Sequence, residues 1–93
     1  MPFLARVNIF KAQKIAKLKN KIVAFLKQHG LFFDQHKYYL TSFIDFKIIE
    51  VALQEEFPQL YIVLSKDEEG KQFFKIYCKN YEHSLMLVYI KSE

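Results

Sequence analysis

The stretch that decides the fold is KQFFKIYCKNYEHSLMLVYIKSE, residues 71 to 93. It holds two strand-like runs joined by the polar turn NYEH at residues 80–83, a length typical of a hairpin. In the first run Phe74, Ile76 and Cys78 share one side of the strand. The other side carries aromatic and lysine side chains in alternation, at Phe73, Lys75, Tyr77 and Lys79. The second run is apolar on both sides, so the two strands have different surroundings.

A third strand-like run precedes these two, and the polar segment KDEEGK at 66–71 separates it from them. We therefore predict strands at about 60–65, 72–79 and 84–91, in an antiparallel meander with 72–79 in the middle. The side with Phe74 should pack on helices, and the side with Phe73 should face away from them. The apolar last strand then needs a cover, from an N-terminal strand or from another chain, because exposed sheet surface of this kind marks interaction sites.

Two helices are predicted upstream of the meander. Residues 11–29 place apolar side chains on one stripe, and Gly30 suits a left-handed cap at the helix end. The stripe consists of Ile15, Leu18, Ile22, Phe25 and Leu26. A second helix should run from about 43 to 56, opened by the capping-box pattern SFID and ended before Pro58. It is apolar around most of its circumference, which predicts packing on more than one side.

The remaining segments give weaker signals. Residues 4–10, LARVNIF, alternate in a way that favours a short strand, although an early helical turn fits them too. Residues 31–41 are rich in aromatic side chains without a helical period, and they fit an irregular loop or a short edge strand. The prediction is a single α+β domain over residues 1–93, with two helices packed on one face of a small, mainly antiparallel sheet. Its element order is β-α-α-β-β-β.

Composition narrows the function classes. One cysteine, Cys78, allows no disulfide within the chain, which favours a reducing, cytoplasmic compartment. No apolar run approaches the length of a transmembrane segment, and the start of the chain lacks the apolar core of a secretory signal. The spacing of His29, Asp34 and His36 is not that of a metal site, and no glycine-rich phosphate loop is present, so we expect no metal and no cofactor. No set of residues has a catalytic pattern.

Charge is distributed unevenly along the chain. Residues 1–40 hold eight basic residues and one acidic residue, which gives +7, whereas residues 41–93 hold six lysines and nine acids, which gives −3. Lys14, Lys17 and Lys21 are spaced three and four apart, so they form one stripe beside the buried stripe of the first helix. A lysine stripe can contact successive phosphates, a membrane surface or an acidic protein, and it can equally be a solvated helix face.

The second candidate site is the strand side that carries Phe73, Lys75, Tyr77 and Lys79. Aromatic rings that stack on bases, interleaved with lysines that reach phosphates, are how β-sheet RNA binders work. We therefore expect a small basic, non-enzymatic binding module for nucleic acid, RNA rather than duplex DNA, which uses this side and the helix stripe. The alternative is a protein-interaction or assembly subunit, with an acidic protein surface as partner or with a homodimer formed through the sheet.

The element order, the basic first helix and the final hairpin FFKIYCKNYEHSLMLVYIK resemble mRNA-cleaving toxins of the RelE/HigB type. This resemblance implies a ribonuclease with catalytic Arg, His or Tyr residues on the late strands, here Tyr77, His83 or Tyr89. Dynein-light-chain-like dimers, which bind peptides at a sheet edge, share the same element order. A likeness of fold does not choose between these functions.

Overall fold

The structure is a computed structural model that describes the backbone of residues 2–41 and 43–91 and the side chains of residues 12–41 and 46–91. Its elements follow one another as α1 (Pro2–Lys27), β1 (Phe32–Asp34), β2 (Lys37–Leu40), α2 (Phe43–Glu56), β3 (Leu60–Lys66), β4 (Gln72–Cys78) and β5 (Ser84–Ile90). The predicted helix at 43–56 and the three predicted strands are confirmed. Ser42, the first residue of the predicted capping box, lies outside the described residues.

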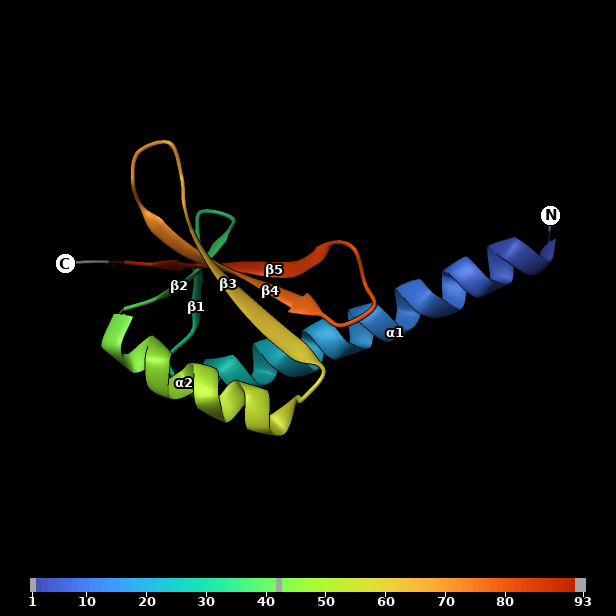
Figure 1. The fold of residues 1–93 in the computed structure, drawn as a ribbon, viewed down its shortest axis with the longest axis horizontal. Coiled ribbons are helices and arrows are strands. Elements are labelled where there is room, and N and C mark those ends of the chain that lie inside the picture. Colours follow the sequence, from blue (N-terminus) through green and yellow to red (C-terminus); the bar gives the residue numbers. More distant parts are fainter. Residues whose placement is uncertain (1, 42, 92–93) are drawn as a thin grey trace.

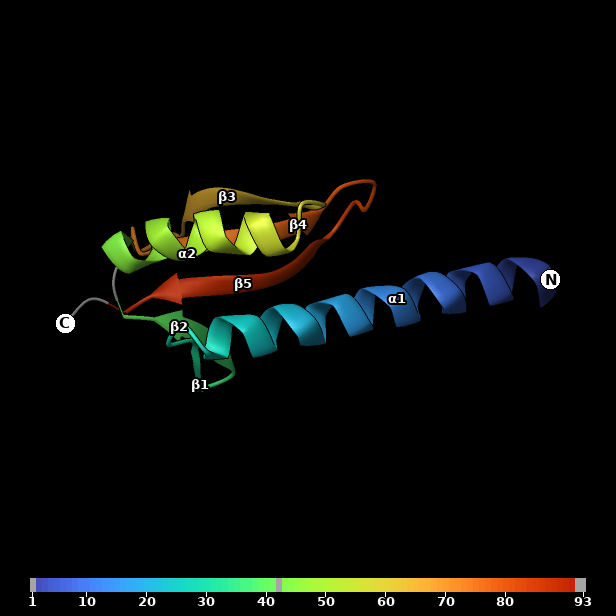
Figure 2. The same cartoon turned by 90° about the horizontal axis from the view of Figure 1, so that it is seen from below.

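The five strands form one sheet in the order β1-β2-β5-β4-β3. All neighbouring pairs are antiparallel except β2 and β5, which are parallel. Both helices lie on the same side of this sheet, α2 near β3 and β4, and α1 near β5 and β2 (Figures 1 and 2). The predicted α+β class, with two helices on one face of a mainly antiparallel sheet, is therefore confirmed.

The core lies between the helices and the sheet. Ile22 and Leu26 of α1 and Phe46 and Leu53 of α2 are fully buried there. The ring of Phe46 stacks on that of Phe74 from β4, with the centroids 3.3 Å apart. The outer side of α2 differs from the prediction, because two of its apolar residues, Ile48 and Val51, are exposed rather than packed.

The predicted strand at residues 4–10 is wrong, because these residues belong to α1. Extending an existing helix adds one hydrogen bond per residue without a new nucleation step. No glycine or proline interrupts residues 3–27, and Pro2 suits the first turn of a helix, where its missing N–H costs nothing. The N-terminal half of α1 consequently extends beyond the sheet (Figure 1).

The end of α1 is capped as predicted at Gly30, whose φ is 99°. The N–H of Leu31 donates to the carbonyl of Leu26, and the N–H of Gly30 donates to that of Lys27. This pair of bonds is the Schellman motif, in which the left-handed residue lets the chain turn back. The turn directs Leu31 into the core and leads into β1 and β2, which belong to the sheet.

Residues 31–41, expected as a loop or a short edge strand, form the hairpin of β1 and β2. Gln35 and His36 make its two-residue turn, both with positive φ, at 48° and 68°. Such turns normally use asparagine and glycine, which adopt positive φ at little cost, so the segment carries no standard hairpin signal.

The apolar character of β5 now has a physical cause. β5 lies between β4 and β2 rather than at an edge, and its partner is β2, not an N-terminal strand. A register shift against β4 at Ile76/Tyr77 allows two successive side chains, Leu85 and Met86, to be buried together. Beyond the shift, Val88 alone is fully buried on the helix side, and its neighbours on either side turn to the opposite face.

Candidate functional site

The face of the sheet opposite α1 and α2, called the open face below, carries a row of four aromatic rings. Residues directly opposite each other on paired strands point to the same face. Phe32 pairs with Tyr39, Tyr39 with Tyr89, and Tyr89 with Phe73, so β1, β2, β5 and β4 each contribute one ring. The successive ring centroids are 5.6, 5.9 and 5.2 Å apart. We call these four residues the aromatic row.

Each ring of the aromatic row has a lysine ammonium near it. Lys37 Nζ lies 4.6 Å from the centroid of Tyr89, and Lys75 Nζ lies 5.9 Å from that of Phe73. Lys91 Nζ lies 5.8 Å from the centroid of Phe32 and 5.7 Å from that of Tyr39, and it also pairs with the Asp34 carboxylate at 3.8 Å. The open face thus combines flat apolar surfaces with positive charge over a short distance.

A second aromatic contact lies further along the open face. Tyr61 of β3 and Tyr77 of β4 are opposite each other, and their rings stack almost parallel, with centroids 5.1 Å apart and an interplanar angle of 8°. Between this pair and the aromatic row, Lys75 stands between Val63 and Leu87. Val63 and Leu87 are large apolar side chains exposed at this face.

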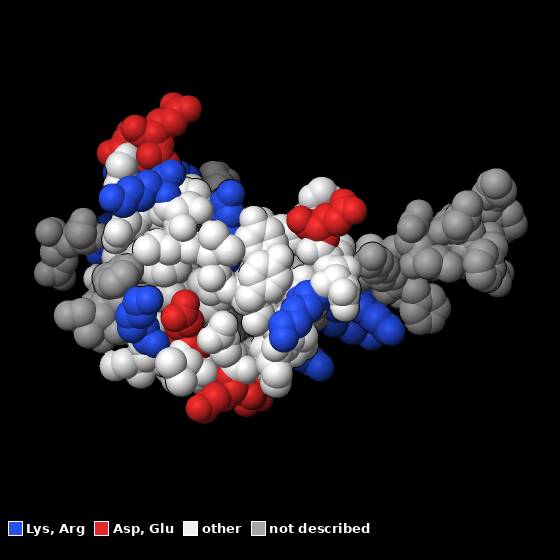
Figure 3. All heavy atoms as spheres, in the orientation of Figure 1, with Lys and Arg blue, Asp and Glu red and all other residues white. Residues whose placement is uncertain are grey.

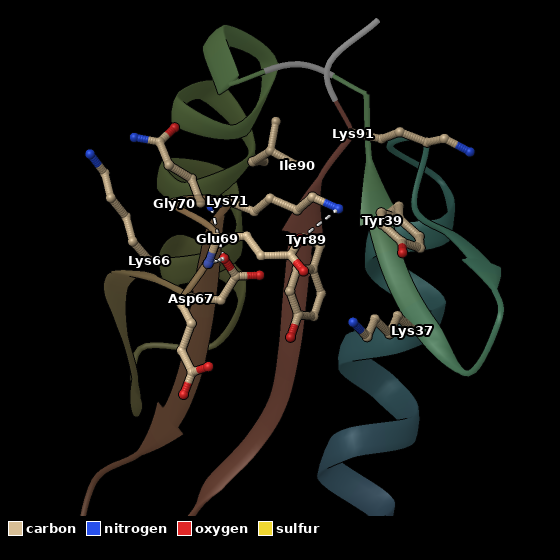
Figure 4. A pocket seen from close by; sticks show the side chains of 12 residues that line it. Lys37, Tyr39, Lys66, Asp67, Glu69, Gly70, Lys71, Tyr89, Ile90 and Lys91 are labelled. Carbon is tan, nitrogen blue, oxygen red and sulfur yellow. Dashed lines mark hydrogen bonds and ion pairs between the residues drawn. The ribbon is translucent and has the colours of Figure 1, made fainter.

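A hollow of about 990 Å³ lies where the aromatic row meets the β3–β4 hairpin. One side of its lining includes Lys37 and Tyr39 of β2, Tyr89 of β5, and Lys91, which follows β5. The other side consists of residues 66–72 of the β3–β4 hairpin. In Figure 4 the two tyrosine rings lie on adjacent strands, and the hairpin side chains face them across the hollow. The hollow therefore has a basic, aromatic floor beside a hairpin wall of mixed charge, with three acids and two lysines.

The hairpin wall is held in a defined shape. Asp67 Oδ1 accepts hydrogen bonds from the backbone N–H groups of Glu69 and Lys71, both at 2.9 Å. Gly70 closes the turn with a φ of 82°. The carboxylate of Glu69 lies 3.5 Å from Lys71 Nζ, while Glu68 is exposed. The hairpin therefore adds three acids and two lysines, a net charge of −1, at one end of the open face.

The structure places the predicted site residues on opposite sides of the sheet. Phe73, Lys75 and Tyr77 lie on the open face, while Phe74 and Ile76 belong to the core. Lys79 follows β4 and continues its pairing, because its N–H donates to the carbonyl of Gln59. The helix stripe, which is exposed, is carried by α1 on the other side of the sheet: Lys14, Lys17 and Lys21. One short ligand cannot contact both sets.

Among the aromatic row and its lysines, five residues were not predicted as binding residues: Phe32, Lys37, Tyr39, Tyr89 and Lys91. Tyr89 could have been found from the parity of β5, because Val88 and Ile90 occupy the other side. The β1–β2 residues could not, since their place depends on the parallel pairing of β2 with β5, which joins segments about fifty residues apart.

The residues implied by the resemblance to mRNA-cleaving toxins are not brought together. Tyr77 and Tyr89 lie at different ends of the open face, because Tyr89 is opposite Phe73, four residues or roughly 13 Å along β4 from Tyr77. His83 lies in the β4–β5 turn, against Tyr81. Within the described residues, no cluster of His, Cys, Asp and Glu could hold a metal ion, and no helix is long and apolar enough to cross a membrane.

Comparison of the chain with protein-family models, with curated proteins and with solved structures finds no match.

Proposed function

We propose that this protein is a non-enzymatic binding module whose open face binds single-stranded nucleic acid, RNA in preference to duplex DNA. One observation carries the proposal: four adjacent strands each contribute one ring to the aromatic row, and each ring has a lysine ammonium between 4.6 and 5.9 Å from its centroid. Stacking and phosphate contact are the two interactions that a single strand requires, and the row offers both at once.

A stacked base is worth more than a lysine ammonium over the same ring, so a bound strand should displace the lysines from the rings. A base stacked on an aromatic side chain contributes about 1–3 kcal/mol, whereas a cation over a ring at an exposed site contributes about 0.5–1 kcal/mol. A lysine side chain is long and flexible, so Lys37 and Lys91 can leave the rings of Tyr89 and Tyr39 for phosphate oxygens while bases take their places. The release of counterions then adds a salt-dependent term.

The shape of the open face favours a single strand over a duplex. Bases in a duplex are stacked inside the helix and present only their edges, so rings on a broad sheet cannot stack on them. The hairpin at 66–71 rises from the sheet on the side away from the helices (Figure 1). It carries Asp67, Glu68 and Glu69 beside Lys66 and Lys71, a net charge of −1, so it offers the phosphates of a duplex no net attraction.

The proposal is tested by fluorescence anisotropy with a labelled single-stranded RNA. Tyr39→Ala and Tyr89→Ala should each weaken binding by about five-fold to a hundred-fold, the equivalent of one base stack. Tyr39→Phe should bind nearly as well as the unchanged chain, since the ring remains. Phe33→Ala is the matched control, because Phe33 is an aromatic residue 57% exposed, and it pairs with Tyr38 on the helix side of the sheet.

Two results would overturn the proposal. The first is that Tyr39→Ala and Tyr89→Ala bind RNA with the same affinity as the Phe33→Ala control. The other is the absence of RNA binding together with retention on an acidic protein surface that depends on Lys37 and Lys91, which would identify the alternative partner.

A further inference from the structure

The free edge of β3 is unusually apolar and unprotected. Sheet edges in natural proteins commonly carry lysine, proline or a bulge, which prevent pairing with another chain. β3 has no charged residue and no proline from Leu60 to Ser65, and its pairing with β4 is regular along its length. Tyr61, Val63 and Leu64 are 41%, 40% and 46% exposed. The other edge, β1, has three residues and ends at the charged Asp34.

The backbone of β3 is ready to pair. The N–H of Lys79 donates to the carbonyl of Gln59, and the N–H of Asp67 donates to that of Lys71. In an antiparallel ladder the bonding direction alternates, so the odd-numbered residues of β3 bond to β4. Ile62 and Leu64 therefore direct their N–H and C=O groups to the free edge.

We infer that β3 pairs antiparallel with β3 of a second copy of this chain, around a two-fold axis at Val63. This register pairs the whole of β3, residues 60–66, with itself, and it places Ile62 opposite Leu64 so that their free backbone groups bond to each other. Residues directly opposite each other share a face, so both copies keep their helices on the same side. The result is a continuous ten-stranded sheet.

The uncharged length of β3 supports a second copy as the occupant. Leu60 to Ser65 carry no charge, so another strand of the same kind and length matches them without burying a charged side chain. Lys66, at the end of β3, is exposed and lies opposite Leu60 of the partner, at the rim of the pairing. Between the two ends, β3 runs across the front of the molecule in Figure 1, and in the same orientation Figure 3 shows surface without charged side chains there.

The same register also joins the two aromatic groups of the open face. Ser65 lies in line with Phe73, the last ring of the aromatic row. Across the two-fold axis, Ser65 is opposite Tyr61 of the second copy, whose ring stacks on Tyr77. The aromatic row of one copy thus continues into the tyrosine pair of the other. Self-association itself does not require that the open face bind RNA.

Analytical sedimentation of the RNA-free protein over a concentration series tests the pairing. We expect a monomer–dimer equilibrium that Leu64→Lys shifts to monomer, because the lysine places a like charge near the axis in both copies. Leu64→Pro, which removes only an N–H directed to the free edge, should act in the same way. Phe33→Lys, the same kind of change at the β1 edge, should leave the dimer intact. A monomer at every concentration, or a dimer that Leu64→Lys leaves unchanged, would overturn the inference.

Disulfide formation tests the register. Val63 and its copy form a pair without direct hydrogen bonds, with Cα atoms about 4.5 Å apart, which is within disulfide range. In a Cys78→Ala background, Val63→Cys should form a covalent dimer on mild oxidation. Tyr61→Cys is the control, because its copy lies four residues, roughly 13 Å, along the partner strand. Equal cross-linking of both variants, or cross-linking of Tyr61→Cys alone, would contradict the axis at Val63.

Discussion

Phe73 and Tyr89 lie directly opposite each other on β4 and β5, with their ring centroids 5.2 Å apart, yet Tyr89 is half-buried whereas Phe73 is almost fully buried. Phe73 is 9% exposed although it belongs to the open face rather than the core. It therefore supports Tyr89 from the side, and the rings available for stacking are those of Phe32, Tyr39 and Tyr89. The role predicted for Phe73 becomes one of positioning.

The two faces of β4 should differ sharply in their effect on stability. Phe74→Ala should lower the free energy of unfolding by about 3–5 kcal/mol, because Phe74 is fully buried against Phe46 and its removal leaves a cavity. Tyr77→Ala removes a cross-strand contact with Tyr61 and should cost about 0.2–1 kcal/mol. Urea denaturation monitored by circular dichroism measures both. Equal destabilisation by the two variants would mean that the open face is covered within the chain.

The cap of α1 gives a test that is independent of the open face. Gly30→Ala should destabilise the protein by about 1–2 kcal/mol, because alanine is strained at a φ of 99°. A Cβ at this position meets no atom within 4 Å, so the destabilisation measures the backbone alone. Gly30→Asn should destabilise the protein less, since asparagine tolerates the left-handed region better. Thermal unfolding of the two variants gives the comparison, and a Gly30→Ala protein as stable as the unchanged chain would exclude the Schellman cap.

The two groups of lysines should respond differently to a short single-stranded RNA. Replacing Lys37, Lys75 and Lys91 with Gln should weaken binding and reduce the dependence of log K on log salt by about 0.7 for each phosphate that is no longer neutralised. Replacing Lys14, Lys17 and Lys21 with Gln removes the same charge from the other side of the sheet, and it should leave that slope unchanged for an oligonucleotide too short to pass around the edge. Anisotropy titrations at several salt concentrations give both slopes. If only the helix variant changes the slope, RNA binds to α1 instead.

The acids of the β3–β4 hairpin should limit affinity at their end of the open face. Glu68→Gln with Glu69→Gln removes two negative charges beside the hollow and should strengthen RNA binding by a few-fold, with a smaller gain at high salt because the repulsion is screened. Glu55→Gln with Glu56→Gln, at the end of α2, is the charge-matched control and should have little effect. An equal increase in affinity in both proteins would show that net charge, not the hairpin, sets the affinity.

Local periodicity was sufficient to predict the meander, the second helix and the cap at Gly30. It also placed Phe73 and Phe74 on different faces, because successive side chains of a strand point to opposite sides. The side without lysines, which carries Phe74, is then the one that packs on the helices. Residues 4–10 were predicted wrongly because LARVNIF alternates like a strand, whereas the growing helix α1 supplies its hydrogen bonds at lower cost.

The hairpin of β1 and β2 is the larger part of the fold that the sequence pattern did not predict. Their turn contains Gln35 and His36 in positive φ, without the glycine or asparagine that signals a two-residue hairpin. The place of Tyr39 beside Tyr89 depends on a parallel contact between distant segments, which no local pattern encodes. Half of the aromatic row was therefore not predictable, although the lysine and aromatic residues on β4 pointed to the correct face.

The most direct test of the proposed interface is an NMR titration of protein with isotopically labelled tyrosine and phenylalanine rings against a single-stranded RNA. Stacked bases should shift the ring signals of Phe32, Tyr39 and Tyr89, because base ring currents act over only a few ångströms. The signals of Phe33 and of the buried Phe46 should stay in place, since both rings lie on the helix side of the sheet. Binding that leaves the three open-face rings unshifted would contradict the proposed interface.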